Sequence, residues 1–250
     1  MKYLYAGIVF CISMVLYMIK RAFENNLVTH EIKLRETPMY NPLKILFISD
    51  IHRRKINAGW FSSLPEVDLV LIGGDITEKG VPFERVKRNA ALLSNAGEAY
   101  FVFGNNDEEI DKEQLISILK NEGIRILEND SAVLENHNHI VLAGIGDINY
   151  LKDDLDKTFS GIEHEEVILL SHDPRVTGKL MHTPYQNQTK LILCGHTHGG
   201  QIRIFGFGPY EKGRVIKHHH YTQLISNGYG TTLLPMRLGA KSEVHLIHIC

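Results

Sequence analysis

The sequence is poor in cysteine, and its three cysteines have no paired spacing. Cys11, Cys194 and Cys250 lie far apart, and no C-x-x-C occurs. This argues against a disulfide framework and against a thiolate zinc site. The formal net charge is only −2 and the basic residues are scattered, so no strong field draws the chain to nucleic acid. We therefore expect no nucleic-acid partner.

The phosphate-binding loops of the common nucleotide-binding folds are also missing. The chain contains neither G-x-x-x-x-G-K nor a strand-linked G-x-G-x-x-G, which argues against a P-loop or Rossmann protein. The 250 residues, of which 22% are charged and 44% hydrophobic, fit one globular domain with a substantial core.

One long apolar run stands at the N-terminus. Residues 3–19 carry no charge, and Lys20 and Arg21 follow them. The run is at the short end of the roughly 17–25 residues that span a bilayer. We expect residues 1–21 to be a retained single-pass anchor in the cell membrane, with a cleaved signal peptide or a buried helix as alternatives. More basic residues follow the run than precede it, which favours a catalytic domain on the cytoplasmic face.

Strands and helices alternate along the rest of the chain, which predicts an α/β domain over residues 44–250 after a polar connector at 22–43. Residues 82–93 and 111–121 are expected to be helices, the second with Asp111 as its N-cap. A hairpin is expected from residues 131–134 and 140–143, around a polar tip at 135–139. The other expected strands are 44–48, 68–72, 99–103, 167–170, 191–194, 201–204, 222–226 and 244–249.

Five short polar segments each follow an aliphatic run that is typical of a buried strand. Because they come at strand ends, we expect them to meet at the carboxyl edge of a sheet. Their carboxylate, amide and imidazole donors, without thiolate, suit Mn, Fe or Zn. Two such ions about 3.5–4 Å apart can clamp a phosphoryl group. The segments are Asp-Ile-His at 50–52, Gly-Gly-Asp at 73–75, Gly-Asn-Asn-Asp at 104–107, Ser-His-Asp at 171–173 and Gly-His-Thr-His-Gly-Gly-Gln at 195–201.

Taken singly, most of these segments have an ordinary structural explanation. Asp-x-His can be a surface or capping sequence, Gly-Gly-Asp a turn, and a lone asparagine a cap. Gly-His-Thr-His-Gly-Gly is more specific, because two imidazoles between glycines have little structural use. All five together, in this order and each at a strand end, favour a functional site.

The ordered set D-x-H, G-D, G-N-x-D, H-D and G-H-T-H-G-G-Q resembles the calcineurin-like metallophosphoesterase superfamily, and more narrowly its bacterial, membrane-associated branch. The resemblance covers residues 44–250. It implies a four-layer α/β/β/α sandwich with a dimetal site at the strand ends. It also implies a metal-dependent phosphoesterase that holds two divalent ions, with Mn²⁺ expected first and Fe or Zn as alternatives. A metal-bound hydroxide would then attack phosphorus in line.

The resemblance also assigns roles to residues by position. In the family a histidine usually follows the asparagine of the G-N-x-D motif, but Asn106 stands there in this chain. An amide can donate a hydrogen bond but cannot act as a general acid, so we expect a preference for good leaving groups, such as aryl esters or pyrophosphate-type bonds. Catalytic contributions are expected from Asp75, Asn106, Asp107 and His172. The metal ligands would be Asp50, His52 and His198 for one ion, Asn105, His172 and His196 for the other, and Asp75 as the bridge.

Substrate contacts are less determined by the sequence. Arg53 and Arg54 follow the first motif, and Arg237 lies in the last third; each could bind phosphate or be an ordinary solvated or structural residue. The histidines at 218–220 could contact substrate or belong to a loop near the mouth of the site. A lipid-borne or nucleotide-linked phosphoester and a small soluble phosphodiester are both compatible substrates. The alternative function is a catalytically weakened metal-binding scaffold for protein partners, although intact ligands argue against it. Oligomeric state stays open.

Overall fold

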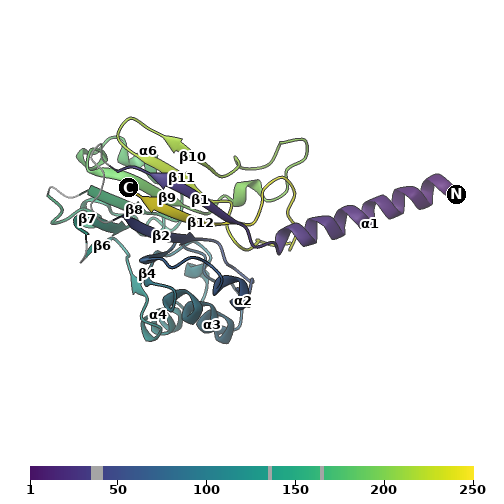
Figure 1. The fold of residues 1–250 in the computed structure, drawn as a ribbon, viewed down its shortest axis with the longest axis horizontal. Coiled ribbons are helices and arrows are strands. Elements are labelled where there is room, and N and C mark those ends of the chain that lie inside the picture. The colour runs from purple at the N-terminus through teal and green to yellow at the C-terminus, as the bar shows by residue number, and fades with distance from the viewer. Residues whose placement is uncertain (35–41, 135–136, 164–165) are drawn as a thin grey trace.

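The aliphatic runs that precede the polar segments form the central strands of two packed β-sheets. The computed structural model describes residues 1–34, 42–134, 137–163 and 166–250. Its two six-stranded sheets lie face to face, and the N-terminal helix projects from this body as a separate rod (Figure 1).

The first sheet has the strand order β1-β12-β2-β3-β4-β5. Strands β2 to β5 are parallel, β12 is antiparallel to β2, and β1 is parallel to β12. Strands β2, β3 and β4 therefore end at the same edge of the sheet. The bounds are β1 Leu27–Ile32, β2 Leu43–Ile48, β3 Leu69–Ile72, β4 Glu98–Phe101, β5 Arg125–Ile126 and β12 Val244–Ile249.

The second sheet has the order β10-β11-β9-β8-β7-β6. Strands β7, β8, β9 and β11 are parallel, while β6 and β10 are antiparallel to their neighbours. The bounds are β6 Asp130–Leu134, β7 His137–Gly144, β8 Glu166–Leu170, β9 Thr189–Cys194, β10 Arg214–Lys217 and β11 Thr222–Ile225.

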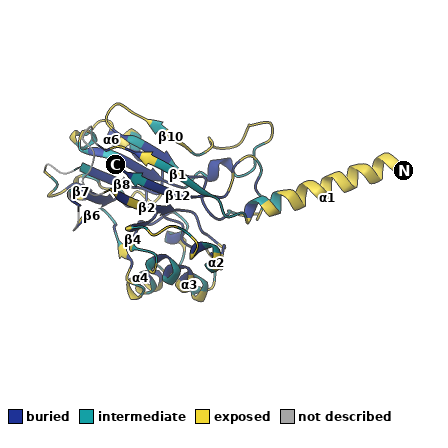
Figure 2. Ribbon diagram, viewed as in Figure 1, coloured by how far each residue is buried: buried dark blue, intermediate teal, exposed yellow. Residues whose placement is uncertain are grey.

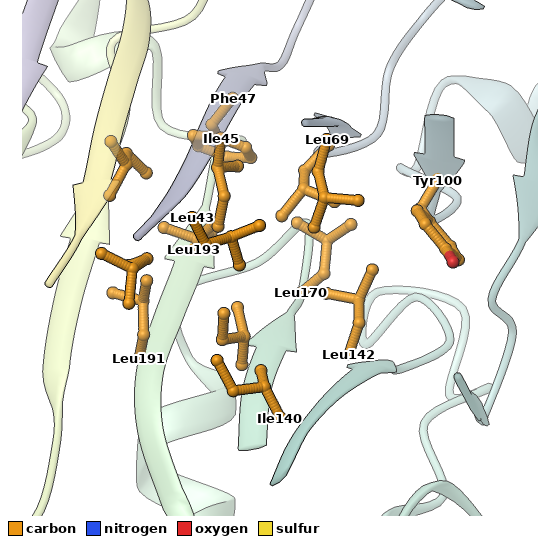
Figure 3. Close-up of a cluster of buried hydrophobic side chains, with 14 of the residues drawn as sticks. Leu43, Ile45, Phe47, Leu69, Tyr100, Ile140, Leu142, Leu170, Leu191 and Leu193 are labelled. Carbon is orange, nitrogen blue, oxygen red and sulfur yellow. The ribbon is translucent and has the colours of Figure 1, made fainter. Parts of the chain in front are cut away.

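Alternate residues of the central strands serve two different cores, because successive side chains point to opposite faces of a sheet. Leu43, Ile45 and Phe47 of β2 face Leu191 and Leu193 of β9 between the sheets (Figure 3). Leu46 and Ile48 of β2 instead pack with the helices outside the first sheet. A strand that is buried on both sides needs an unbroken apolar sequence, which is why these strands stand out in the chain.

Helices cover the outer face of each sheet. Val86, Ala90 and Leu93 of α3 pack onto the first sheet, while Val176 and Leu180 of α6 pack onto the second. These layers and the two sheets confirm the expected α/β/β/α sandwich. The bounds are α1 Lys2–Ala22, α2 Ala58–Phe61, α3 Phe83–Ser94, α4 Lys112–Asn121, α5 Leu155–Thr158 and α6 Val176–Leu180, with 3₁₀ turns η1 Asp107–Glu109, η2 Pro184–Gln186 and η3 His198–Gly200.

The expected helix boundaries agree with these elements. The Asp111 side chain accepts a hydrogen bond from the Gln114 backbone N–H at 3.0 Å, which makes Asp111 the N-cap of α4. Gly123, just beyond α4, has a φ of +77°. An L-residue rarely adopts such a φ, so a glycine here ends the helix at low cost.

Several elements differ from the sequence-based expectations. Residues 201–204 make isolated bridges rather than a strand, because the backbone is left-handed from 199 to 201 and interrupts the extended run. The expected connector at 22–43 contains β1, which pairs with β12 at the sheet edge. His137 and His139 belong to β7 and not to a hairpin tip; residues 135–136 of that tip lie outside the described residues.

Helix α1 joins the body at the edge where β2, β3 and β4 end. Leu27, the first residue of β1, pairs with Val244 at the start of β12, and β12 runs antiparallel to β2. The start of β1 therefore lies beside the carboxyl end of β2. Residues 2–17 of α1 are all exposed (Figure 2), and the helix is long and apolar enough to cross a bilayer.

Candidate metal centre

The five polar segments lie together at the carboxyl edges of the two sheets. Asp50 and His52 follow β2, Asp75 follows β3, and Asn105 follows β4. His172 follows β8, while His196 and His198 follow β9. The face-to-face packing of the sheets brings these two sets of loops into contact. All seven residues expected as ligands are thus in one cluster.

Left-handed backbone is concentrated in this cluster. This region of φ is uncommon for residues other than glycine, and each such residue costs on the order of 1–3 kcal/mol. Such strain persists only where the surrounding structure holds it, and it is typical of functional sites. The residues and their φ values are Asp50 at 54°, His52 at 50°, Asp75 at 50°, His196 at 72° and His198 at 49°.

Asp50, His52 and His198 form what we call the inner group. The Nε2 atoms of His52 and His198 are 3.0 Å apart, and His198 Nε2 is 3.4 Å from Asp50 Oδ1. One donor atom from each residue lies within 4.8 Å of the others. All three side chains are buried. Two imidazole nitrogens and a carboxylate oxygen that converge in this way form a suitable donor set for a divalent cation.

Asn105, His172 and His196 form the outer group. The Asn105 Oδ1 atom is 2.9 Å from His196 Nδ1 and 3.2 Å from His172 Nε2, and these two nitrogens are 3.2 Å apart. The other ring nitrogen of His172, Nδ1, donates to the Gly73 carbonyl oxygen at 2.8 Å. This hydrogen bond keeps a proton on Nδ1 and directs Nε2 into the cluster.

Asp75 lies between the two groups. Its Oδ2 atom is 3.7 Å from His52 Nε2 and 3.3 Å from His172 Nε2. Burial alone would raise the pKa of Asp75, but His172 and His52 together lower it below its usual range. Asp75 therefore stays a carboxylate in the interior, where an unpaired charge would be costly.

The loop glycines allow the strand ends to approach this closely. Gly74 has a φ of +84°, and a Cβ there would lie 2.6 Å from His172 Nδ1 and 2.8 Å from the Gly104 nitrogen. A side chain at either glycine would push the loops apart, since one at Gly104 would lie 2.3 Å from Asp75 Oδ1.

Glu78 is a neighbour of the site that sequence reasoning missed. Its Oε2 atom is 3.0 Å from His52 Nδ1, and its Oε1 atom pairs with Arg53. Burial opposes a charge on His52, but Glu78 and the carboxylates of the cluster raise its pKa above the usual value. A pocket that favours a proton on a buried imidazole also favours a bound cation. The only sequence signal was the position of Glu78 three residues after Asp75.

Asn106 and Asp107 both hold Asp75 in place, one through its carboxylate and the other through its backbone. The Asn106 backbone N–H and side-chain amide donate to the two Asp75 carboxylate oxygens, each at 2.8 Å. The buried Asp107 carboxylate accepts N–H bonds from Gly104 at 2.9 Å and Asp75 at 2.6 Å. Asp107 thereby ties the loop after β3 to the loop after β4. Asn106 lines the cleft described below, whereas Asp107 is not among its lining residues.

The three arginines considered for phosphate binding have different surroundings. The Arg53 side chain is 62% exposed and pairs with Glu78. Arg54 is buried and donates to the carbonyl oxygens of Ala22, Phe23, Glu24 and Tyr229. Arg237 is fully buried and donates to the carbonyl oxygens of His198, Asn227 and Gly230. The guanidinium groups of Arg54 and Arg237 thus stabilise the loops behind the site. Because both are buried, neither is placed to bind a substrate phosphate.

The histidine tract does not line the cleft at the cluster. His218, His219 and His220 line a separate pocket of about 530 Å³, together with Lys190 and Cys250. The expected position of this tract near the mouth of the site is therefore wrong. The sequence could not show that the connection between β10 and β11, which contains the tract, lies away from that mouth.

A cleft of about 500 Å³ opens onto the outer group. Its polar part includes Asp75, Asn105, Asn106, His196 and His198. Its remaining lining is largely apolar and comes from two segments of the C-terminal third, with Ile202, Pro209 and Tyr210 from one and Leu233 and Leu234 from the other. The cleft therefore joins a polar floor to apolar walls.

Comparison with known proteins agrees with this arrangement. A model of the calcineurin-like phosphoesterase family matches residues 43–200, which include all seven clustered residues. The chain belongs to the calcineurin-like phosphoesterase family. It is accordingly a metal-dependent phosphoesterase with a binuclear site for divalent ions.

Individual relatives of this calcineurin-like chain cover most of its length. It is 39% identical over 247 residues to the uncharacterized protein YpbG of Bacillus subtilis, with 95% of this chain and 93% of that protein covered. It is 28% identical to the phosphodiesterase YaeI of Escherichia coli, with 83% and 82% covered. Among solved structures, a sulfate thiohydrolase SoxB from Thermus thermophilus matches with a TM-score of 0.51 at 13% identity, covering 86% of this chain and 58% of that one. At this identity the last likeness concerns the fold alone.

Proposed function

We propose that the inner and outer groups each hold one divalent ion and that Asp75 bridges the two. The position of Asp75 carries this proposal, because the same carboxylate oxygen approaches one histidine of each group. The donors are oxygen and imidazole nitrogen, which suit Mn²⁺, Fe or Zn, and we propose Mn²⁺. When bound, two such ions lower the pKa of water and stabilise the charge that develops on a phosphoryl group.

The residues of the chain have separate tasks in this proposal. Glu78 orients the His52 ring through Nδ1, and the Gly73 carbonyl orients His172, so that each ring presents Nε2 to the site. The two hydrogen bonds from Asn106 hold the Asp75 carboxylate in place. Arg53, exposed beside Glu78, is the arginine that can attract a substrate phosphate.

The proposed reaction is the hydrolysis of a phosphodiester or pyrophosphate-type bond. Asn106 lines the cleft but its amide cannot give a proton to a leaving group. The reaction would therefore depend on a leaving group that is stable as an anion, such as an aryl oxide or a phosphate.

We also propose that α1 anchors the enzyme in a membrane. The helix is long and apolar enough to cross, and its residues 2–17 are exposed. Lys20 and Arg21 at the end of α1 favour placement of the catalytic domain on the cytoplasmic face.

The test compares the wild-type enzyme with an Asp75→Asn variant. The purified full chain in detergent is stripped of metal, reloaded with Mn²⁺ and assayed with bis-p-nitrophenyl phosphate. We expect metal-dependent turnover that falls by about a thousandfold in the variant, since bound metal contributes several kcal/mol to the transition state. Turnover by the wild type no higher than by the variant would instead support the metal-binding scaffold. Metal analysis of both proteins separates loss of ions from loss of fold.

A further inference from the structure

Two loops on the cleft side of the molecule expose large apolar side chains. We call residues 201–212 and 231–237 the rim loops, since both contribute to the wall of the cleft. Phe205 is 96% exposed, Phe207 82% and Leu233 93%. Single exposed apolar residues are ordinary on soluble domains, but several on adjacent loops at the mouth of a site mark an interaction surface.

The backbone holds two of these side chains at the tips of the rim loops. Phe205 has a φ of 52° and Leu233 a φ of 59°. This left-handed conformation is unusual for a large side chain and costs free energy. Asparagine or glycine would fit the same turns with less strain and better solubility. Apolar residues in these two strained positions therefore indicate a partner that compensates for both costs.

The rim loops are tied to each other and to the end of α1. The Gln201 side chain donates to the carbonyl oxygens of Thr232 and Leu234, each at 3.1 Å. The Arg237 backbone N–H donates to the Met18 carbonyl oxygen at 3.0 Å. Met18 is also where α1 first becomes partly buried. The rim loops thus lie beside the point where the projecting helix meets the body (Figure 1).

This attachment sets where a bilayer would lie. If residues 3–19 span the hydrocarbon, its boundary falls within about one helical turn of Met18. The second rim loop is hydrogen-bonded at that level, and the first is hydrogen-bonded to the second. Both loops and the mouth of the cleft therefore face the same membrane surface that receives α1.

We propose that the rim loops insert into the surface of the bilayer that holds α1, and that the cleft between them takes the phosphoester headgroup of a membrane lipid. The polar floor at Asp75 and His196 fits the phosphoester, while the walls at Ile202 and Leu234 fit the adjoining apolar part of the molecule. The acyl chains would stay in the bilayer. This inference rests on the anchoring and the phosphoesterase activity proposed above.

Fluorescence quenching in vesicles tests the docking without any need for activity. The full chain is reconstituted in phosphatidylethanolamine and phosphatidylglycerol vesicles that contain brominated lipid, and a tryptophan is placed by Phe205→Trp. A Val9→Trp variant in the middle of α1 reports the anchor, and a Met181→Trp variant reports the opposite end of the body. The signal of the parent protein, which has Trp60 as its one tryptophan, is subtracted.

We expect bromine to quench tryptophans at 9 and 205 but not at 181. Quenching at 9 without quenching at 205 would overturn the docking and leave the anchor intact. An absence of quenching at 9 would overturn the anchor itself. A spectrum at 205 that changes with protein concentration and not with bromine would show that a second copy covers the rim loops, and would also overturn the proposal.

A matched pair of substrates tests the lipid assignment. Methyl p-nitrophenyl phosphate in water and hexadecyl p-nitrophenyl phosphate in vesicles share the reacting bond and differ only in the chain. The rim variant is F205N/F207S, because Phe205 and Phe207 are 96% and 82% exposed and neither is among the residues that line the cleft. Asparagine tolerates the left-handed backbone at position 205. The control variant is V133S/M181S, because Val133 and Met181 are 56% and 55% exposed. Val133 lies near the end of β6, away from the carboxyl edge of β7.

The rim variant should lose about tenfold or more in kcat/KM for the hexadecyl ester, since burial of one such side chain is already worth about that factor. Its rate with the methyl ester should stay within about twofold of wild type, as should both rates of the control variant. Equal losses with both esters, or no loss with either, would overturn the lipid assignment. Inactivity of wild type with both esters would refute the proposed phosphodiester hydrolysis. The quenching experiment does not depend on that activity, so the two failures can be told apart.

Discussion

The inner and outer groups of the metal centre use similar side chains in different surroundings. The side chains of Asp50 and His52 are 0% exposed, and His198, at 8%, is the one inner residue that lines the cleft. In the outer group His172 is 0% exposed, but Asn105 and His196 line the cleft and the His196 side chain is 21% exposed. Arg237 donates to the His198 carbonyl oxygen, and Glu78 approaches His52, so the inner group is also supported from behind. The main supporting contact of the outer group is at His172, whose Nδ1 donates to the Gly73 carbonyl oxygen.

This difference shows how one site can hold its metal-binding donors rigidly and still admit a substrate. Buried donors with supporting contacts lose little entropy when a cation binds, because their rotamers are already restricted. Donors beside open solvent can be replaced by water and leave room for a substrate. We therefore expect the inner group to determine metal retention and the outer group to meet the phosphoester.

The sharpest way to break this comparison is to remove one histidine from each group. His52→Ala should lower turnover of bis-p-nitrophenyl phosphate by about a thousandfold, because no water can readily fill a sealed, supported position. His196→Ala should lower it by about a hundredfold, since solvent reaches that position. Calorimetric titration with Mn²⁺ should show weaker binding of one ion in each variant. Equal losses in both variants would contradict a functional difference between the groups.

The support behind the inner group is tested by Arg237→Met. The guanidinium is fully buried, and its loss would remove the donor to the Asn227 and Gly230 carbonyl oxygens. We expect the free energy of unfolding to fall by about 3 kcal/mol, measured by denaturant unfolding of the full chain in detergent. The control is Arg53→Met, where the exposed side chain should contribute less than about 1 kcal/mol. A similar change in both variants would show that burial of Arg237 contributes little.

Glu78→Gln tests the contact that orients His52. The amide keeps the size of the side chain but loses the charge that faces His52 Nδ1 and Arg53. Partners of this kind usually contribute about 10–100-fold to metal affinity, so we expect a loss in that range for Mn²⁺ by calorimetry. Glu109→Gln, at the exposed last residue of η1, serves as the control and should bind Mn²⁺ as wild type does. Unchanged affinity in the Glu78 variant would mean that this contact is only structural.

The smallest expected effect comes from Asn106→His on the open side of the site. A histidine there could supply the proton that an amide cannot. We expect about a tenfold gain for alkyl phosphodiesters relative to aryl phosphodiesters, measured as the dependence of kcat on leaving-group pKa. The histidine also removes the side-chain hydrogen bond to Asp75, so absolute rates can fall while the ratio rises. A ratio equal to that of wild type would show that the leaving group needs no proton from this position.

Sequence reasoning was most successful where local chemistry and burial coincide. Strands such as β2 and β9 are apolar on both faces, so their positions could be predicted without any partner strand. The polar residues that follow them stood out for the same reason. Strand β1 was missed because only one of its residues, Ile32, is buried, and its place depends on pairing with β12.

The surroundings of the site could not be predicted in this way. Arg53 and Arg54 are neighbours in the chain, yet one is exposed and the other is buried among carbonyl oxygens. Glu78 belongs to no recognisable motif. Its role depends on the distance of 3.0 Å between its Oε2 atom and His52 Nδ1, which lies in the loop after the neighbouring strand. In the first rim loop the sequence predicted a strand at 201–204, and no pattern marked either loop as part of the cleft wall.

The amino-acid sequence by itself determined the chemistry of this protein: which donors follow which strands, and the length of the apolar run at the N-terminus. These are properties of single residues and of their spacing, so they need no knowledge of the fold. Only the tertiary structure decided which donors share a group and which arginines are buried. It alone also placed the mouth of the cleft beside α1. Those relations join residues that are far apart in the chain, and they arise because two sheets pack face to face and bring their carboxyl edges together.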